Sequence, residues 1–362
     1  MPECIVIGGG VIGMMTARAL HLSGVEVLLL ERGPLGGESS WAGGGIISPL
    51  YPWRYQDSVN CLAQYSKDLY TDLVAQLNDE GKVDCELIKS GLLFVDQDEK
   101  ELALSWARQW SENVQLIADR QTVLSIEPAL GNEIEQALWM PEVMQVRNPK
   151  IIKALRGSFD RLGIAYREHA PVQEIIVQSG RVTGVQVADE VLAADRVIVA
   201  GGAWSAGLID EVQSVDVEPV KGQMIMFKGE PELIKRIVLS EGHYIIPRRD
   251  GRVLAGSTLE KAGFDKTTSE AALESLRETA SALAPVLGKL PIERQWAGLR
   301  PGTENGVPYV CAVDDVEGLY LHAGHYRNGI VLGAASVQLM TELIMGKEPF
   351  CDPSPYKVAA VH

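Results

Sequence analysis

The sequence predicts an α/β fold in which a parallel sheet carries inserted blocks of antiparallel strands. Residues 4–30 read as a strand, a glycine turn, a helix and a second strand. The blocks 171–202 and 223–255 have the apolar pattern and turn residues of paired strands, and residues 318–346 return to a strand that leads into an amphipathic helix. A strand–helix–strand unit implies a parallel sheet that is covered on both faces.

The remaining elements follow from local pattern, in chain order. The expected helices are 11–23, 57–77, 100–113 and 269–283. The expected strands are 4–7, 25–30, 91–95, 223–227, 244–247 and 252–255, with a hairpin that turns at Ser179 and Gly180 and an apolar strand at 196–202. Residues 34–49 are rich in glycine and serine, and so long a loop is usually functional.

The first turn carries a dinucleotide-binding motif. GGGVIG at 8–13 fits G-x-G-x-x-G between a strand and a helix. Gly8 permits the tight turn, Gly10 lets the backbone approach a pyrophosphate, and Gly13 lets helix and strand pack closely. Glu31 ends the second strand, where an acid binds a ribose hydroxyl. The unit is therefore Rossmann-like, and alone it supports NAD as well as FAD.

Two further segments favour FAD. In ESSWAGGGIISP, Ser39 and Ser40 can donate to phosphate, and the glycines 43–45 allow backbone N–H groups to lie close to a flat ring. In HAGHYRNGIVLG, residues 322–333, a strand ends in a turn and a second helix begins. That helix N-terminus can stabilise negative charge on a reduced flavin. Because motifs near both ends of the chain are expected to contact the same ligand, that ligand should be a long cofactor.

Composition restricts the partners. Hydrophobic residues make up 46% and charged residues 22% of the 362 residues, which is ordinary for a globular enzyme. The formal net charge of −15 disfavours nucleic acid and membrane surfaces. Five scattered cysteines without a CxxC pair suit a reducing cytosol, and the apolar start lacks the basic leader of a signal peptide, so we expect a cytoplasmic protein. His322 and His325 form an H-x-x-H without a third ligand, so no metal is expected.

These motifs, in this order, resemble the FAD-dependent amine and amino-acid oxidases of the D-amino-acid oxidase type, and within them the glycine oxidases of thiamine biosynthesis. The resemblance extends over IVIGGGVIG, SSWAGGGIISP, VIVAGGAWS, PVKGQ, YIIPRRDGRVLAGST, WAGLRPGTENGVPY and GHYRNGI. It implies a Rossmann-like FAD-binding domain formed by 1–50, 145–218 and 305–362. An inserted antiparallel-sheet substrate domain would be formed by 51–144 and 219–304.

The resemblance also implies which residues hold a non-covalent FAD. Beyond Gly8 and Gly10, the expected cofactor residues are Val11, Ile12, Gly13, Glu31, Arg32, Ser39, Ser40, Gly44, Gly45, Ile46, Val172, His325, Arg327, Asn328, Gly329, Ile330 and Val331. Val172 would meet the adenine through its backbone, and the segment 325–331 would close around the flavin ring. Cys311 is a weak match to the cysteine that some amine oxidases of this group link covalently to FAD.

For the substrate, the resemblance implies a carboxylate held by Arg300 and by the hydroxyl of Tyr244. A guanidinium suits this role because it can donate two parallel hydrogen bonds. Arg327 would meet the amino group through its carbonyl or screen the ring through its side chain. The implied reaction passes a hydride from the α carbon of glycine, sarcosine or a small D-amino acid to flavin N5, and no side-chain base is required. The products are a 2-oxo acid, ammonia and, with dioxygen as acceptor, hydrogen peroxide.

Three alternatives stay open at this point. The first is a sarcosine-oxidase-like or D-amino-acid-dehydrogenase-like enzyme of the same fold. The second is a non-catalytic or tRNA-modifying flavoprotein, which the acidic net charge and the absence of a basic tract disfavour. The third is a pure NAD dehydrogenase. The resemblance further implies a homo-oligomer, which the composition does not test.

Overall fold

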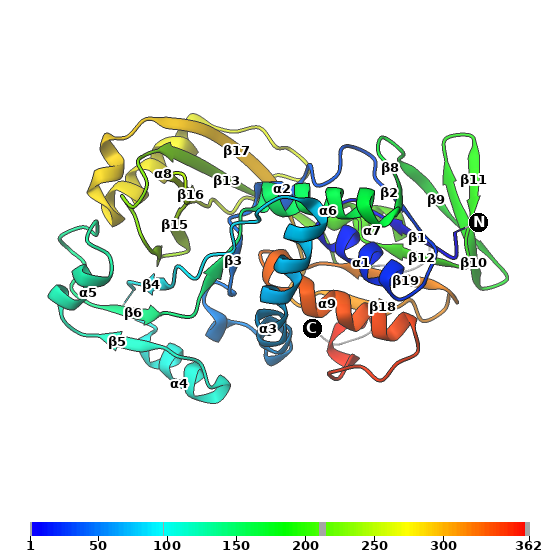
Figure 1. Cartoon of the computed structure of the whole chain (residues 1–362), viewed down its shortest axis with the longest axis horizontal. Coiled ribbons are helices and arrows are strands. Elements are labelled where there is room, and N and C mark those ends of the chain that lie inside the picture. The colour runs from blue at the N-terminus through cyan, green and yellow to red at the C-terminus, as the bar shows by residue number, and fades with distance from the viewer. Residues whose placement is uncertain (1, 97, 210–214, 359–362) are drawn as a thin grey trace.

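The structure, a computed structural model, describes residues 2–96, 98–209 and 215–358. Two large sheets lie side by side, with helices α3 (Asp57–Gly81) and α6 (Asn148–Leu162) between them (Figure 1). Each sheet has its own apolar layers, and the glycine-rich motifs gather where the two halves meet.

The first sheet has six strands, of which five are parallel. Its strand order is β18 (Tyr309–Ala312), β19 (Leu319–Ala323), β12 (Arg196–Val199), β1 (Cys4–Ile7), β2 (Val27–Leu30) and β8 (Ala165–Arg167). Only β18 pairs antiparallel in this sheet, with β19. The expected strand–helix–strand unit is confirmed, since α1 (Val11–Leu22) connects β1 and β2.

The two faces of this sheet are covered differently. One face packs against a helical layer of α1, α3, α6 and α9 (Gly329–Ile344), where the buried side chains include Met14, Tyr70 and Phe159. The other face packs against an antiparallel sheet of β9 (Val172–Gln178), β10 (Arg181–Val187) and β11 (Glu190–Ala193), with α7 (Ser205–Ile209) beside it. Both faces are thus buried, which explains the continuous apolar runs of β1 and β2.

The second sheet has eight strands and is mostly antiparallel. Its order is β17 (Ile292–Gly302), β13 (Glu218–Lys228), β16 (Arg252–Gly256), β15 (His243–Pro247), β14 (Ile237–Ser240), β4 (Leu92–Phe94), β6 (Ala137–Met140) and β5 (Gln115–Ile117). The exception is β14, which runs parallel to β4. Helices α5 (Arg120–Ile126) and α8 (Glu270–Leu283) cover one face, and α4 (Lys100–Trp110) packs on the other.

Short elements complete the chain. The segment 34–49 is not wholly a loop: it holds helix α2 (Ser39–Ala42) and strand β3 (Ile46–Ile47), which pairs with β7 (Met144–Gln145). The 3-10 turns are η1 (Pro52–Arg54), η2 (Gly202–Trp204), η3 (Pro285–Lys289) and η4 (Ser354–Tyr356). Helix α3 falls in the segment 51–144 that we assigned to the substrate domain, yet it packs against α6 and α9. The domain boundaries stay a prediction.

Candidate cofactor and substrate site

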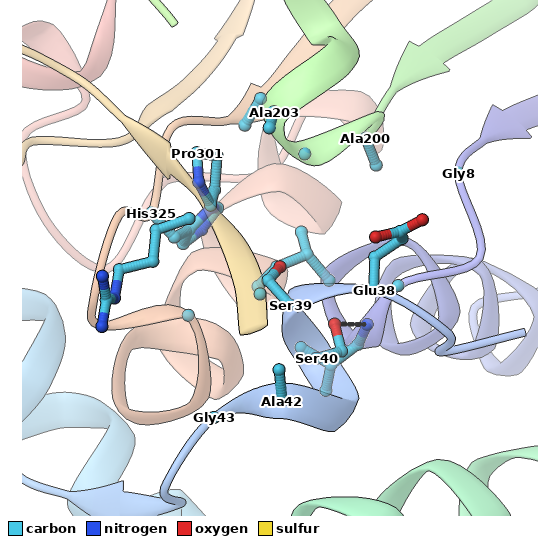
Figure 2. Close-up of a pocket in the computed structure, with 18 of the residues that line it drawn as sticks. Gly8, Glu38, Ser39, Ser40, Ala42, Gly43, Ala200, Ala203, Pro301 and His325 are labelled. Atoms are coloured by element: carbon cyan, nitrogen blue, oxygen red, sulfur yellow. Dashed lines mark hydrogen bonds between the residues drawn. The ribbon is translucent and has the colours of Figure 1, made fainter. Parts of the chain in front are cut away.

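A cavity of about 430 Å³ lies between the two large sheets. It gathers most of the residues that the sequence singled out (Figure 2). The expected site residues that line it are Gly8, Gly10, Val11, Ile12, Glu31, Arg32, Ser39, Ser40, Gly44, Gly45, Ile46, Val172, Tyr244, Arg300, His325, Arg327, Gly329 and Ile330. The other expected residues, Gly13, Asn328 and Val331, do not line it, and Val331 lies in the helical core instead.

The turn before α1 is shaped by glycines that leave no room for a side chain. Gly8 has φ +113°, and a Cβ atom there would lie 2.3 Å from the carbonyl oxygen of Ala200. At Gly13 a Cβ atom would lie 1.9 Å from the carbonyl oxygen of Gly8, so this glycine acts through packing rather than by lining the cavity. The N-terminus of α1 therefore sits directly at the cavity, where its positive end attracts anions.

Two side chains organise the backbone N–H groups of this turn. Ser40 Oγ accepts a hydrogen bond from the backbone N–H of Val11 at 2.9 Å, which Figure 2 marks. Glu31 accepts from the backbone N–H of Gly9 at 2.6 Å and from that of Gly33 at 2.7 Å. Because Glu31 holds the turn and its own loop together, its carboxylate is fixed at the end of β2.

Arg32 and Trp204 form the wall beside Glu31. The Arg32 guanidinium lies 3.5 Å from the ring centre of Trp204, and it pairs with Glu38 at 3.2 Å. The Phe264 ring also stacks on the Trp204 ring, with ring centres 5.1 Å apart. Trp204 follows the VIVAGG strand and stands in one of the matched motifs, but its contact with Arg32 was not predicted.

The segment 39–46 is tied to the second sheet by Arg248. The Arg248 guanidinium donates to the carbonyl of Gly44 at 2.6 Å, to Gln145 Oε1 at 2.7 Å and to the carbonyl of Val146 at 3.1 Å. Gly45 has φ +74°, and a Cβ atom there would lie 2.1 Å from the Val146 carbonyl oxygen. Burial lowers the pKa of Arg248 to about 10, so it stays charged at neutral pH. This anchor was not predicted.

Arg300 extends across strand β13 in the cavity wall. Its Nη1 donates to the carbonyls of Lys221 at 3.3 Å and Thr258 at 3.2 Å, and its Nη2 donates to Ser257 Oγ at 2.6 Å. A guanidinium has five N–H groups, so these bonds leave two. Burial lowers the pKa of Arg300, and the neighbouring Tyr244 partly opposes that shift.

Tyr244 and Met224 complete this end of the cavity. Tyr244 is buried, and its hydroxyl lies 3.7 Å from Met224 Sδ. Met224 also lines the cavity and was not predicted. Gly222 makes room for Arg300, since a Cβ atom there would lie 2.1 Å from Nη2. The motif PVKGQ contained this glycine, but only the pairing of β13 with β17 shows why it is needed.

The turn after β19 closes the cavity from the far side. The backbone N–H of Tyr326 donates to the carbonyl of Pro301 at 2.8 Å, which joins this turn to the strand of Arg300. Figure 2 shows Pro301 and His325 across the cavity from Ser39 and Ser40. Arg327 lines the cavity, and the side-chain amide nitrogen of Asn328 is buried without a hydrogen-bond partner among the described residues.

His322 and His325 are buried neutral groups. Burial lowers the pKa of His325 to about 3 and that of His322 well below its ordinary range. His322 Nδ1 lies 3.0 Å from Thr16 Oγ1, whose hydroxyl donates to the carbonyl of Ile12 at 2.8 Å. His322 therefore donates through Nδ1. His325 Nε2 lies 3.0 Å from Ser336 Oγ, and His322 Nε2 is buried without a hydrogen-bond partner among the described residues. Their lowered pKa values make both imidazoles weak bases.

The cavity fits a dinucleotide with a flat ring system. The α1 N-terminus supplies N–H groups, the glycines exclude side chains, and one wall carries Arg32 and Trp204 while another carries Tyr244 and Arg300. Comparison with known proteins identifies the ligand. The family model "FAD dependent oxidoreductase" matches residues 3–343.

The chain belongs to the FAD dependent oxidoreductase family. Its cofactor is therefore FAD. A glycine oxidase of Pseudomonas putida is 46% identical over 98% of this chain and 97% of that protein. One of Pseudomonas aeruginosa is 44% identical over 98% of both. A bifunctional protein ThiO/ThiG of a Nostoc species is 29% identical over 95% of this chain and 52% of that protein.

Solved structures of the same family share the fold. A glycine oxidase of Geobacillus kaustophilus superposes with a TM-score of 0.95 and 28% identity, over 100% of this chain and 99% of that chain. One of Bacillus cereus gives a TM-score of 0.90 at 31% identity, over 96% of both. The predicted α/β fold of the D-amino-acid oxidase type is thereby confirmed.

The described residues offer no support for a membrane span, a metal site or a covalent flavin link. No helix there is long and apolar enough to cross a membrane. Within the same part of the chain, no group of three or more His, Cys, Asp or Glu side chains is placed to hold a metal ion. Cys311 lies buried in β18 and does not line the cavity, so the structure gives no support to a covalent link at this position.

Proposed function

We propose that this member of the FAD dependent oxidoreductase family oxidises glycine with dioxygen. Glycine, dioxygen and water give glyoxylate, ammonia and hydrogen peroxide. The observation that carries the proposal is the Arg300 guanidinium in the cavity wall beside Tyr244, because a cation in a protein of net charge −15 is what an amino-acid carboxylate requires. The 46% and 44% identical relatives are glycine oxidases, which supports glycine as the substrate.

The side chains of the cavity would bind and position the substrate, while the cofactor supplies the redox chemistry. FAD, when bound, supplies the redox chemistry: it would accept a hydride equivalent from the substrate and pass the electrons on to dioxygen. Arg300 and Tyr244 would hold the carboxylate, which fixes the α carbon in one place. Arg327 would contact the amino group through its carbonyl or cover the site with its side chain. The expected cofactor residues would bind FAD as the resemblance implies, from Gly8 and Glu31 to the 325–331 turn.

No carboxylate in the cavity wall is free to take a proton from the substrate. The acidic residues that line the cavity are Glu31 and Glu38. Glu31 accepts two backbone N–H bonds, and Glu38 pairs with Arg32 and Lys266. The substrate must therefore bind with its amine already neutral, and a water molecule then hydrolyses the imine product. This arrangement supports hydride transfer without a side-chain base.

We further propose that the reaction serves thiazole formation in thiamine biosynthesis, in the cytoplasm, as a homo-oligomer. The match over 95% of the chain to a protein named ThiO/ThiG supports the pathway. The five free cysteines, of which Cys4, Cys85 and Cys311 are buried, suit a reducing compartment. Light scattering coupled to size exclusion would test the oligomeric state.

A substrate panel tests the proposed reaction. The FAD-loaded protein would be given glycine, sarcosine, D-alanine and D-proline, and peroxide and oxygen consumption would be followed. Peroxide from glycine, with glyoxylate in equal amount, is the expected result. Turnover of sarcosine or D-proline alone would favour a sarcosine-oxidase-like enzyme. Reduction of an artificial dye without oxygen consumption would favour a dehydrogenase.

A further inference from the structure

The Arg300 guanidinium is held by the segment that follows β16 and by strand β13, and of its acceptor residues only Ser257 lines the cavity. Its acceptors are Ser257 Oγ and the Thr258 carbonyl, which follow β16, and the Lys221 carbonyl on β13. Successive residues of a strand point to opposite faces of the sheet. Gly222 and Met224 line the cavity, so Lys221 and Gln223 point to the other face. The position of Arg300 therefore depends on what fixes residues 257 and 258 from behind.

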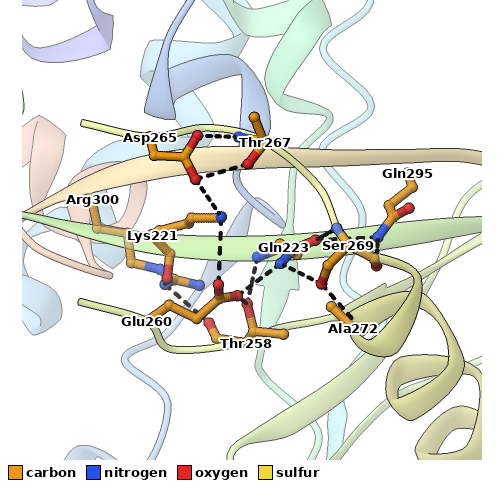
Figure 3. A network of polar contacts seen from close by, with 10 residues as sticks. All are labelled: Lys221, Gln223, Thr258, Glu260, Asp265, Thr267, Ser269, Ala272, Gln295 and Arg300. Carbon is orange, nitrogen blue, oxygen red and sulfur yellow. Dashed lines mark hydrogen bonds and ion pairs between the residues drawn. The ribbon is translucent and has the colours of Figure 1, made fainter. Parts of the chain in front are cut away.

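A polar network on that hidden face provides the fixation (Figure 3). Glu260 Oε1 accepts from the Thr258 hydroxyl at 2.5 Å and from Gln223 Nε2 at 2.9 Å. Glu260 Oε2 lies 3.5 Å from Lys221 Nζ. The backbones of Lys221 and Glu260 also exchange two hydrogen bonds, at 2.9 and 3.0 Å. One carboxylate thus holds three side chains of the two segments that supply acceptors to Arg300.

The network is built for rigidity. Gln223 and Lys221 are only 1% and 5% exposed, so their amide and ammonium groups require partners within the protein. The backbone N–H of Gln223 donates to Thr258 Oγ1 at 2.8 Å, which leaves the Thr258 hydroxyl hydrogen for Glu260. Although burial alone would raise the pKa of Glu260, hydrogen bonds from Thr258 and Gln223 and the charge of Lys221 keep it below its ordinary value.

A second acid on Lys221 provides an internal comparison. Asp265 Oδ2 lies 3.2 Å from Lys221 Nζ and also accepts from the Thr267 hydroxyl at 2.8 Å. Figure 3 shows Asp265 and Glu260 on opposite sides of the lysine. Asp265 shares the charge interaction of Glu260 with Lys221, whereas the hydrogen bonds from Thr258 and Gln223 go to Glu260. A change at Asp265 should therefore alter the charge near Lys221 without releasing Thr258.

We propose that Glu260 is a positioning residue for the substrate carboxylate. Through Thr258 and Lys221, Glu260 holds the Arg300 guanidinium across Gly222. The remaining N–H groups of Arg300 are then available to the substrate carboxylate. The proposal rests on the proposed function for the identity of the substrate and on the contacts above for the coupling. Glu260 itself does not line the cavity, so it acts on the substrate indirectly, through the residues that hold Arg300.

Glu260→Gln in the FAD-loaded protein tests the coupling. The KM for glycine should rise about tenfold while kcat changes by less than about twofold, since loss of a charge-assisted contact loosens binding and not the reaction. The dissociation constant for acetate, measured by the change in flavin absorbance, should rise by the same factor. Asp265→Asn should leave both constants near those of the unchanged protein.

A second pair of variants guards against a folding defect at Glu260. Thr258→Val removes the hydroxyl and should raise KM and the acetate constant, whereas Thr258→Ser should restore both. Glu260→Gln weakens the Thr258–Glu260 hydrogen bond by removing its charge, and Thr258→Val removes the same bond. The two changes combined should therefore raise KM by less than the product of their separate effects. Equal thermal midpoints would show that the fold is intact.

The outcomes separate the two proposals. Unchanged KM and acetate binding in folded Glu260→Gln and Thr258→Val would overturn the positioning role, as would an equal rise in Asp265→Asn. If the unchanged protein binds acetate but does not oxidise glycine, the proposed function fails and the acetate titration still decides the role of Glu260. If it binds no carboxylate, both proposals are wrong.

Discussion

At the scale of single residues, the chemistry of Arg300 depends on its shape as much as on its charge. Its guanidinium reaches acceptors at Lys221, Ser257 and Thr258 at the same time. Arg300→Lys keeps the charge, but a compact ammonium group cannot span these acceptors and also hold a carboxylate by two bonds. We expect kcat/KM for glycine to fall by about 100-fold or more, measured by oxygen consumption. An unchanged flavin spectrum would serve as the control for FAD binding.

A substitution at Gly222, on the neighbouring strand β13, would also test the position of the Arg300 guanidinium. A Cβ atom at Gly222 would lie 2.1 Å from Arg300 Nη2 and 2.3 Å from Nη1. Because these atoms end a flexible side chain, Gly222→Ala should move the guanidinium rather than unfold the sheet. We expect a rise of about tenfold or more in KM for glycine with a thermal midpoint close to that of the unchanged protein. A normal KM would show that the guanidinium can bind substrate from another position.

The burial of His325 should make the stability of the protein depend on pH. Its pKa is about 3 in the folded protein because of burial, against an ordinary value near 6.5. The folded pKa is depressed, so the stability is fully present above about pH 6.5 and is lost as the pH falls toward 3. At pH 5 the loss should be about 2 kcal/mol for this histidine.

Urea unfolding of the protein without FAD at pH 7 and pH 5 measures this effect. His325→Gln keeps a donor for Ser336 Oγ and cannot be protonated, so its loss between the two pH values should be smaller by that amount. An equal loss in both proteins would show that His325 does not contribute.

At the scale of elements, the packing of α1 against the turn before it depends on Gly13. A Cβ atom there would lie 1.9 Å from the backbone oxygen of Gly8, which cannot move aside as a side chain can. Gly13→Ala should lower the free energy of unfolding by about 1–3 kcal/mol and weaken FAD binding. Gly333→Ala in α9 is the matched control, since its nearest contact would be an ordinary 3.6 Å. It should stabilise the protein by up to about 1 kcal/mol. Equal effects would contradict the packing argument.

Elements with strong local signals were predictable from the sequence, and those defined by distant contacts were not. The β1–α1–β2 unit, the hairpin at Ser179 and Gly180, and α8 after Ser269 were predicted near their observed positions. Helix α6 was missed, although proline in its first turn is a typical start signal. The parallel pairing of β14 with β4 joins residues far apart in sequence, and local pattern carries no information about it.

The candidate site was predictable to the same degree. The glycine turns stand in a recognisable dinucleotide motif, and the family resemblance assigned Arg300 and Tyr244 to the same site before any contact was known. Trp204, Met224, Gly222 and Arg248 could not be assigned, because their roles arise where β13, β17 and the 39–46 segment meet. Glu260 is further removed still, since its contacts lie on the face of the sheet away from the cavity.

At the scale of the whole molecule, the cavity exists because two sheets are held in one relative position. Arg248 follows β15 of the eight-stranded sheet and donates to Gly44 and Val146 in the segments that lead to the FAD motifs. A Cβ atom at Gly44 would lie 2.6 Å from Ile246 Cδ1 and 3.4 Å from the Tyr244 ring, so the cofactor segment also packs directly on the substrate wall. FAD affinity and substrate geometry should therefore change together when this junction is disturbed.

Arg248→Met tests this expectation. It fills similar volume but leaves the Gly44 and Val146 carbonyls and Gln145 Oε1 without their donor, which should lower the free energy of unfolding by about 3 kcal/mol. The FAD dissociation constant, measured by flavin fluorescence, and the acetate constant of the loaded protein should both rise. Arg248→Lys retains a donor, so its two dissociation constants should lie between those of Arg248→Met and those of the unchanged protein. If Arg248→Met weakens FAD binding but leaves acetate binding unchanged, the two walls are set independently, and the carboxylate site is a property of the eight-stranded sheet and the 257–260 segment alone.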